Sequence, residues 1–130
     1  MKIEHFAINV AEPAAVAQWY YEHLGLTIVR QKKEPPFTTF LGDDSGQVLL
    51  EMYNNPPDEV PEYKIMNPLQ LHLAFVSADP REDARRLMAA GASLVSDDVL
   101  DDGSHLIMLR DPWGLALQLC KRAVPMLSNP

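Results

Sequence analysis

The chain repeats itself at a constant spacing, and this duplication constrains its fold more than any other feature. His5 and His72 lie 67 positions apart (72 − 5). Glu51 and Gln118 keep the same offset of 67 (118 − 51), and Asp44 again has an aspartate 67 positions later. Equivalent residues of a duplicated module keep a constant offset from one another. The sequence therefore predicts two equivalent modules.

Each module has the same order of expected elements, namely one strand, one helix and three further strands. In the first module the apolar periodicity predicts them over residues 3–10, 12–24, 26–31, 37–42 and 47–53. In the second module they fall at residues 69–76, 80–90, 93–99, 104–110 and 115–121. Gly25 is placed for a left-handed helix end, and Asp79 is a typical residue to precede a helix.

The length of the chain suits one ordinary domain. Its 130 residues are 47% apolar, which is enough to bury a core. We expect a single domain over residues 1–123, followed by a tail at 124–130. Within the domain we expect module one at 1–55, a proline-rich connector at 56–68 and module two at 69–123.

The charge of the chain narrows the choice of partners. Its formal net charge of −7 would repel nucleic acids and anionic membranes, so we expect neither as a partner. The single cysteine, Cys120, cannot form an internal disulfide, and the N-terminus has no long apolar segment. These features indicate a cytoplasmic protein.

Strand alternation places four polar residues on the faces that the helices leave uncovered. Because alternate residues of a strand share a face, the aliphatic residues of the first strand should pack beneath the helix while His5 faces away. The same alternation puts Glu51, His72 and Gln118 on helix-free faces. These side chains would converge if the two sheets lay side by side with those faces inward.

These residues also have ordinary structural explanations. A single histidine in an apolar strand is more often a satisfied structural residue than a ligand. Glu51 in VLLEMY is harder to explain in this way, because a buried carboxylate is costly unless it is paired, protonated or bound to a cation. Taken together with a repeat-related histidine pair, it favours a metal site.

The repeated element order, the phrases YYEHLGLTIV and LRDPWGLALQL and the four polar residues resemble the vicinal oxygen chelate superfamily. This superfamily includes glyoxalase I, bleomycin-resistance proteins and extradiol dioxygenases. The resemblance implies an α+β fold in which two βαβββ modules form a cupped, incompletely closed β-barrel. It also implies a homodimer and a divalent metal ion in the cup (Zn, Ni, Co, Mn or Fe).

By position in the motif, four residues match the metal-ligand places of the superfamily: His5, Glu51, His72 and Gln118. Gln118 is a departure, because many metal-using members carry glutamate there. The resemblance implies a metal-dependent enzyme of the glyoxalase I-like type, a lyase or isomerase acting on a small oxygenated substrate through a metal-stabilised enediolate. Glu51 is the only carboxylate of the four, so it is the candidate base.

Two alternatives remain open at this point. His5, His72 and Glu51 also make up a two-histidine, one-carboxylate set suited to Fe(II) dioxygenase chemistry. A metal-free drug-binding protein of the bleomycin-resistance type would use the same fold without any metal, and its acidic surface would favour a cationic drug.

Overall fold

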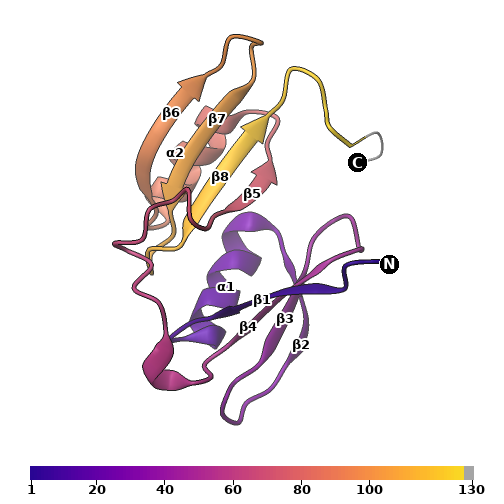
Figure 1. The fold of residues 1–130 in the computed structure, drawn as a ribbon, viewed down its shortest axis with the longest axis vertical. Coiled ribbons are helices and arrows are strands. Elements are labelled where there is room, and N and C mark those ends of the chain that lie inside the picture. The colour runs from indigo at the N-terminus through magenta and orange to yellow at the C-terminus, as the bar shows by residue number, and fades with distance from the viewer. Residues whose placement is uncertain (128–130) are drawn as a thin grey trace. The chain divides into compact units, whose positions relative to one another are not determined.

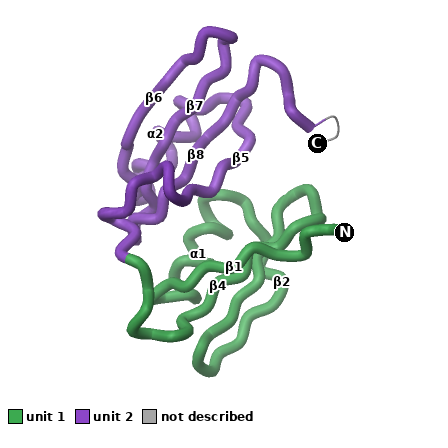
Figure 2. Tube along the Cα trace, viewed as in Figure 1, with its two compact units in different colours: residues 1–61 green, residues 62–130 purple. Residues whose placement is uncertain are grey.

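The computed structural model describes residues 1–127 and divides the chain into two compact units, residues 1–61 and 62–130 (Figures 1 and 2). The connector expected at 56–68 is shared between the two units. The last three residues of the tail expected at 124–130 lie outside the described residues. None of the helices among the described residues is both long and apolar enough to cross a lipid bilayer.

The first unit is an open four-stranded sheet with one helix. Its elements are β1 (His5–Asn9), α1 (Pro13–Leu24), β2 (Thr27–Gln31), β3 (Thr39–Gly42) and β4 (Leu49–Tyr53), followed by a short 3-10 helix, η1 (Pro57–Glu59). The strand order is β1-β4-β3-β2. β1 runs parallel to β4, whereas the other neighbours are antiparallel.

The second unit repeats this arrangement. Its elements are β5 (Leu73–Val76), α2 (Pro80–Ala89), β6 (Ser93–Val99), β7 (His105–Arg110) and β8 (Ala116–Lys121). The strand order is β5-β8-β7-β6, with β5 parallel to β8. The predicted α+β class, with one strand, one helix and three strands repeated, is therefore confirmed.

The strand register reproduces the repeat found in the sequence. Ala7 pairs with Glu51 on β1 and β4, and Ala74 pairs with Gln118 on β5 and β8. Ala74 lies 67 positions after Ala7, and Gln118 lies 67 positions after Glu51 (74 − 7 and 118 − 51). The last strand of each unit thus presents Glu51 or Gln118 at the same place.

The turn before that last strand departs from the constant offset. Asp43 accepts a hydrogen bond from the backbone N–H of Ser45 through its side chain, as Asp111 does from Trp113. The aspartate equivalent to Asp111 is therefore Asp43, at an offset of 68 (111 − 43), and pairing Asp44 with Asp111 is wrong by one residue. The reason is that this turn needs an aspartate whose side chain accepts the backbone N–H of the residue two positions later, and Asp43 does so in the first unit.

Each unit buries a core between its helix and the covered face of its sheet. In the first unit the most deeply buried side chains include Val16 and Tyr20 of α1, which share one side of the helix because they lie four positions apart. They pack with Leu41 and Met52 of the sheet. The second core includes Leu87, Ile107, Leu109 and Leu117.

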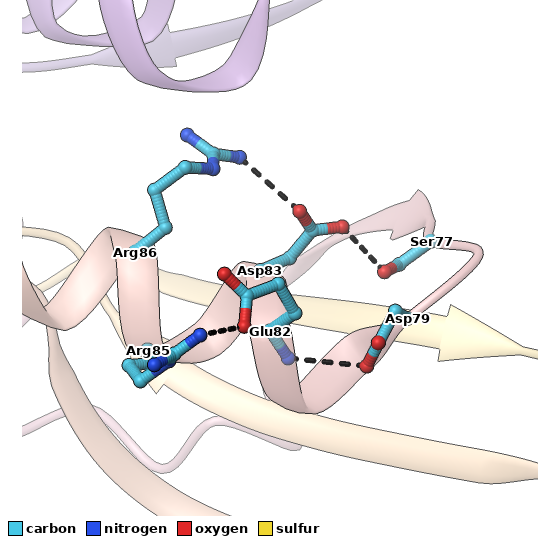
Figure 3. A network of polar contacts seen from close by, with 6 residues as sticks. All are labelled: Ser77, Asp79, Glu82, Asp83, Arg85 and Arg86. Carbon is cyan, nitrogen blue, oxygen red and sulfur yellow. Dashed lines mark hydrogen bonds and ion pairs between the residues drawn. The ribbon is translucent and has the colours of Figure 1, made fainter.

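The helix ends follow the local signals in the sequence. Gly25 ends α1 with φ of 70°, the left-handed conformation expected of a glycine there. Asp79 precedes α2, and its carboxylate accepts the backbone N–H of Glu82 at 3.2 Å (Figure 3). In the same network Ser77 donates to Asp83 at 2.6 Å, so the loop entering α2 is held to its first turn.

The strand expected at residues 69–76 is shorter in the structure and begins at Leu73. The preceding segment forms a turn, because Asn67 accepts the N–H of Leu69 through its side chain and that of Gln70 through its carbonyl. Local bonds of this kind compete with strand pairing. Expecting a strand over residues 69–72 was therefore wrong.

The start of the second unit is fastened to the turn between β7 and β8. The guanidinium of Arg110 donates to the carbonyl oxygens of Tyr63, Met66 and Gly114 at 2.7–3.1 Å. Gly114 has φ of 100°, and a Cβ built there would lie 2.6 Å from the backbone nitrogen of Lys64. Only glycine therefore allows this close packing of backbone on backbone.

We expect Gly114→Ala to lower the free energy of unfolding much more than Gly103→Ala. Both glycines have positive φ, 100° and 90°, so alanine suffers backbone strain in either place; that strain costs roughly 1–2 kcal/mol. Only position 114 adds a collision with Lys64, since a Cβ at Gly103 would meet nothing within 4 Å. Urea unfolding curves of the two variants measure the difference, and equal losses would contradict the packing.

Candidate functional site

Two of the predicted site residues lie together on the helix-free face of the first unit. The parallel register of β1 and β4 pairs His5 with Leu49 and Ala7 with Glu51. Nε2 of His5 lies 3.7 Å from Oε1 of Glu51. The structure therefore brings this histidine and this carboxylate side by side from opposite ends of the module.

Both predicted histidines have one ring nitrogen already bonded. Nδ1 of His5 lies 2.9 Å from Oε1 of Glu4, and Nδ1 of His72 lies 2.8 Å from the carbonyl oxygen of Pro68. These oxygens can only accept, so Nδ1 is the donor in each contact and Nε2 is the nitrogen left to face another group. Imidazoles that bind metals commonly hold their other nitrogen in this way.

The second unit places the other two residues at repeat-equivalent positions. His72 lies immediately before β5, and Gln118 lies on β8 opposite Ala74. Oε1 of Gln118 accepts a hydrogen bond from the thiol of Cys120 at 3.2 Å. This bond fixes the amide along the strand and leaves the oxygen a second lone pair.

Glu51 is the one carboxylate of the predicted set, and it is mostly buried. Its side chain is 17% exposed, compared with 40% for His5. A carboxylate removed from water to this extent needs a cationic or hydrogen-bonding partner. Within residues 1–61 the imidazole of His5 is the basic group nearest to it.

The pair His5–Glu51 fits a divalent metal ion. Each ligand atom lies about 2.0–2.2 Å from such an ion, so two adjacent ligand atoms lie about 2.8–3.6 Å apart, depending on the coordination geometry. The observed 3.7 Å therefore requires only a small movement. Imidazole nitrogen with carboxylate oxygen is also a suitable donor set for Zn, Fe, Co or Ni.

Within residues 1–127, no group of three or more His, Cys, Asp or Glu side chains is gathered closely enough to hold a metal ion. Each unit contributes two of the four predicted ligands, and one of the four is an amide.

Two further residues lie on this face and were not predicted as site residues: Phe40 and Arg30. Phe40 on β3 pairs with Glu51, and its ring meets that of His5 edge to face at 6.1 Å. Arg30 on β2 pairs with Phe40, and its Cζ lies 5.9 Å from the centre of the Phe40 ring. Arg30 was not predicted here because simple strand alternation assigns it to the helix side of the sheet.

Another histidine cluster lies outside this site. His105 bonds Asp97 at 2.6 Å, and Arg81 of α2 bonds the same carboxylate at 3.2 Å. The bond from His105 is the main reason that the pKa of Asp97 lies below its usual value, although partial burial opposes it. Because Arg81 belongs to the helix, these groups lie on the helix side of the second sheet.

The sequence is similar to a known family over most of its length. A family model described as "Glyoxalase-like domain" matches residues 5–120. No curated protein shows significant similarity to the sequence.

Solved structures share the fold over nearly the whole chain. A glyoxalase family protein from Enterococcus faecalis is 28% identical, with a TM-score of 0.71 over 92% of this chain and 97% of that one. Lactoylglutathione lyase from Agrobacterium tumefaciens is 20% identical, with a TM-score of 0.70 and 96% of each chain covered. The antibiotic-binding protein TnmS3 from Streptomyces sp. CB03234 is 16% identical, with a TM-score of 0.70 over 92% of this chain and 93% of that one.

We expect the thiol of Cys120 to react slowly with iodoacetamide at neutral pH. Burial raises the pKa of Cys120, and the nucleophile is the thiolate, so less of the reactive form is present than in a free cysteine. Mass spectrometry of native and urea-unfolded protein measures the two labelling rates, with Cys120→Ser as the unlabelled control. Equal rates in the two states would contradict the burial.

Proposed function

The chain belongs to the glyoxalase-like domain family, and we propose that it is a metal-dependent enzyme of the glyoxalase I-like type. It would act as a lyase or isomerase on a small oxygenated substrate. The observation that carries the proposal is the placement of His5 beside Glu51, with Nε2 of the imidazole 3.7 Å from the carboxylate. The repeat gives His72 and Gln118 the equivalent positions in the second unit.

We propose that four residues hold one divalent metal ion (Zn, Ni, Co, Mn or Fe): His5, Glu51, His72 and Gln118. Two neutral imidazoles, one carboxylate and one amide would leave a net charge of about +1 on the ion. When bound, a metal of this kind stabilises negative charge that develops on substrate oxygens. The Nδ1 contacts of both histidines support this assignment, because imidazoles that bind metals commonly hold their other nitrogen in this way.

In this proposal Glu51 moves the proton. Its carboxylate would accept a proton from the hydroxyl-bearing carbon next to the substrate carbonyl and return it to the former carbonyl carbon. The hydroxyl hydrogen would pass from one substrate oxygen to the other, so that the isomerisation balances. The low exposure of Glu51, 17%, limits competition from water. Phe40 supplies an apolar wall beside it, and the bond from His5 to Glu4 keeps the imidazole in one orientation.

The assembly and location in this proposal follow the family resemblance. We propose a homodimer working in the cytoplasm, where a lone cysteine such as Cys120 remains reduced.

One observation favours a second candidate, a metal-free small-molecule binding protein. Gln118 provides an amide where a carboxylate would bind a cation more strongly, and its oxygen already accepts the Cys120 thiol at 3.2 Å. A structural neighbour, TnmS3, is described as an antibiotic-binding protein. Metal content separates the two candidates.

We expect the purified protein to bind one equivalent of a divalent metal and Glu51→Gln to weaken that binding at least tenfold, because the amide cannot supply the negative charge. Equilibrium dialysis against Co²⁺ or Zn²⁺, followed by elemental analysis, measures the affinity. Glu59→Gln, on the exposed η1 segment, is the matched control and should bind metal as the wild type does.

The same variants test the role of Glu51 in catalysis. A panel of α-hydroxy and α-keto carbonyl compounds in D₂O reports proton exchange by NMR, which Glu51→Gln should abolish while its thermal melting curve stays cooperative. Undiminished exchange in that variant would remove Glu51 from the mechanism. Only trace metal, with no uptake on reloading, would instead support the binding protein.

A further inference from the structure

We propose that Arg30 forms an anion-binding position on the face that carries His5 and Glu51. The substrate would then carry a carboxylate or phosphate at one end, in addition to the oxygens recognised near Glu51. This inference rests on the proposed function, because it names the class of substrate for the same site. All the residues that carry it lie within the first unit.

Arg30 lies in one row with the candidate base. Arg30 pairs with Phe40 across β2 and β3, and Phe40 pairs with Glu51 across β3 and β4. Residues directly opposite one another on neighbouring strands project from the same face of the sheet. The ring contacts agree with this register, since Phe40 lies against both the guanidinium of Arg30 and the imidazole of His5.

An irregularity in β2 turns Arg30 toward this face. The register shifts between Ile28, which pairs with Leu41, and Arg30, which pairs with Phe40. In a regular ladder Val29 would pair with Phe40, and Arg30 would point to the helix side. β-Bulges frequently redirect a side chain next to an active site.

The second unit has the same bulge without the cation. Its register shifts between Leu94 and Ser96, each 66 positions after Ile28 and Arg30 (94 − 28 and 96 − 30). The bulge therefore belongs to the duplicated architecture, whereas the arginine is particular to the first unit. Serine in the equivalent place shows that the fold does not require a long cation there.

The guanidinium is available to a ligand. Arg30 is exposed, and no carboxylate within residues 1–61 forms an ion pair with it. Arginine binds carboxylate and phosphate through a planar fork of N–H donors, and stacking on an aromatic ring helps to hold that fork in place. In a chain of net charge −7, such an arginine gives this face a local attraction for an anion.

The distances limit the length of the ligand. The guanidinium carbon lies 5.9 Å from the Phe40 ring centre, and that centre lies 6.1 Å from the His5 ring. These two distances limit the separation of the guanidinium and the imidazole to 12.0 Å. An anion that accepts a hydrogen bond of about 2.8 Å from Arg30 would therefore be separated from the His5 imidazole by a distance that a short carbon chain can span.

We expect wild-type protein to bind 2-oxoglutarate at least tenfold more tightly than 2-oxopentanoate, because the two differ only in the distal carboxylate and a hydrogen bond to a charged group is worth about a factor of ten or more. Isothermal titration calorimetry measures both affinities. Arg30→Gln should reduce the preference to about twofold or less, and Arg30→Lys should restore part of it. Arg85→Gln, on an exposed part of α2, is the control that should keep the preference.

Three results would overturn the inference: no preference in the wild type, a preference that survives in Arg30→Gln, or no binding of 2-oxoglutarate. Thermal melting of each variant confirms that it is folded. Competition by sodium acetate or by inorganic phosphate distinguishes a carboxylate site from a phosphate site, since the better competitor identifies the preferred anion.

Metal-loaded and EDTA-treated samples separate this inference from the proposed function. If the protein binds metal but Arg30→Gln changes nothing, only the anion site is wrong. If the protein binds no metal and the preference still depends on Arg30, only the proposed metal enzyme is wrong.

Discussion

The parallel pairing of the first and last strands of each module is the constraint on which the rest of the site depends. In the first unit β1 is an edge strand bonded to β4, and the pairing is extended at one end by Leu49 N–H to Glu4 O and at the other by Val10 N–H to Tyr53 O, at 2.9 and 2.8 Å. A slip of one residue would turn Glu51 to the helix side, because alternate residues face opposite ways. The burial of Met52 beneath α1 opposes that slip, so the core fixes the position of the carboxylate.

The duplicated register then supports different chemistry in the two units. In each sheet, three residues paired across neighbouring strands form a row that begins on the last strand. The residues at equivalent positions of the two rows are Glu51 and Gln118, Phe40 and Met108, and Arg30 and Ser96. The first member of each pair is charged or aromatic, and the second is neutral. The backbone of each module thus supplies equivalent positions, and in this row only the first unit carries ionisable side chains, Glu51 and Arg30. In the proposed enzyme, proton transfer and anion recognition would both come from that unit.

Local signals made most of the fold predictable. Gly25 and Asp79 mark helix ends through bonds within one turn, and alternation along β1 and β4 identified His5 and Glu51. The failures share a different cause. The bulge that redirects Arg30 depends on which residue of β3 lies opposite, and the turn around Asn67 depends on bonds that outcompete strand pairing. The four proposed ligands come from both units, and alternation within a strand assigns each side chain only to a face of its own sheet.

The separation of Arg30 from Glu51 by one aromatic residue has a consequence for selectivity. In the proposed site, a substrate anchored by its anion at Arg30 would extend along the row past Phe40 toward Glu51. Binding energy gained at a remote group can be used to hold a reacting carbon near its base, which converts affinity into rate. A neutral compound of the same length lacks that anchor and reaches Glu51 in many orientations. The bulge in β2 is therefore the structural element that would let a chain of net charge −7 select an anionic substrate while keeping its own carboxylate as the proton acceptor.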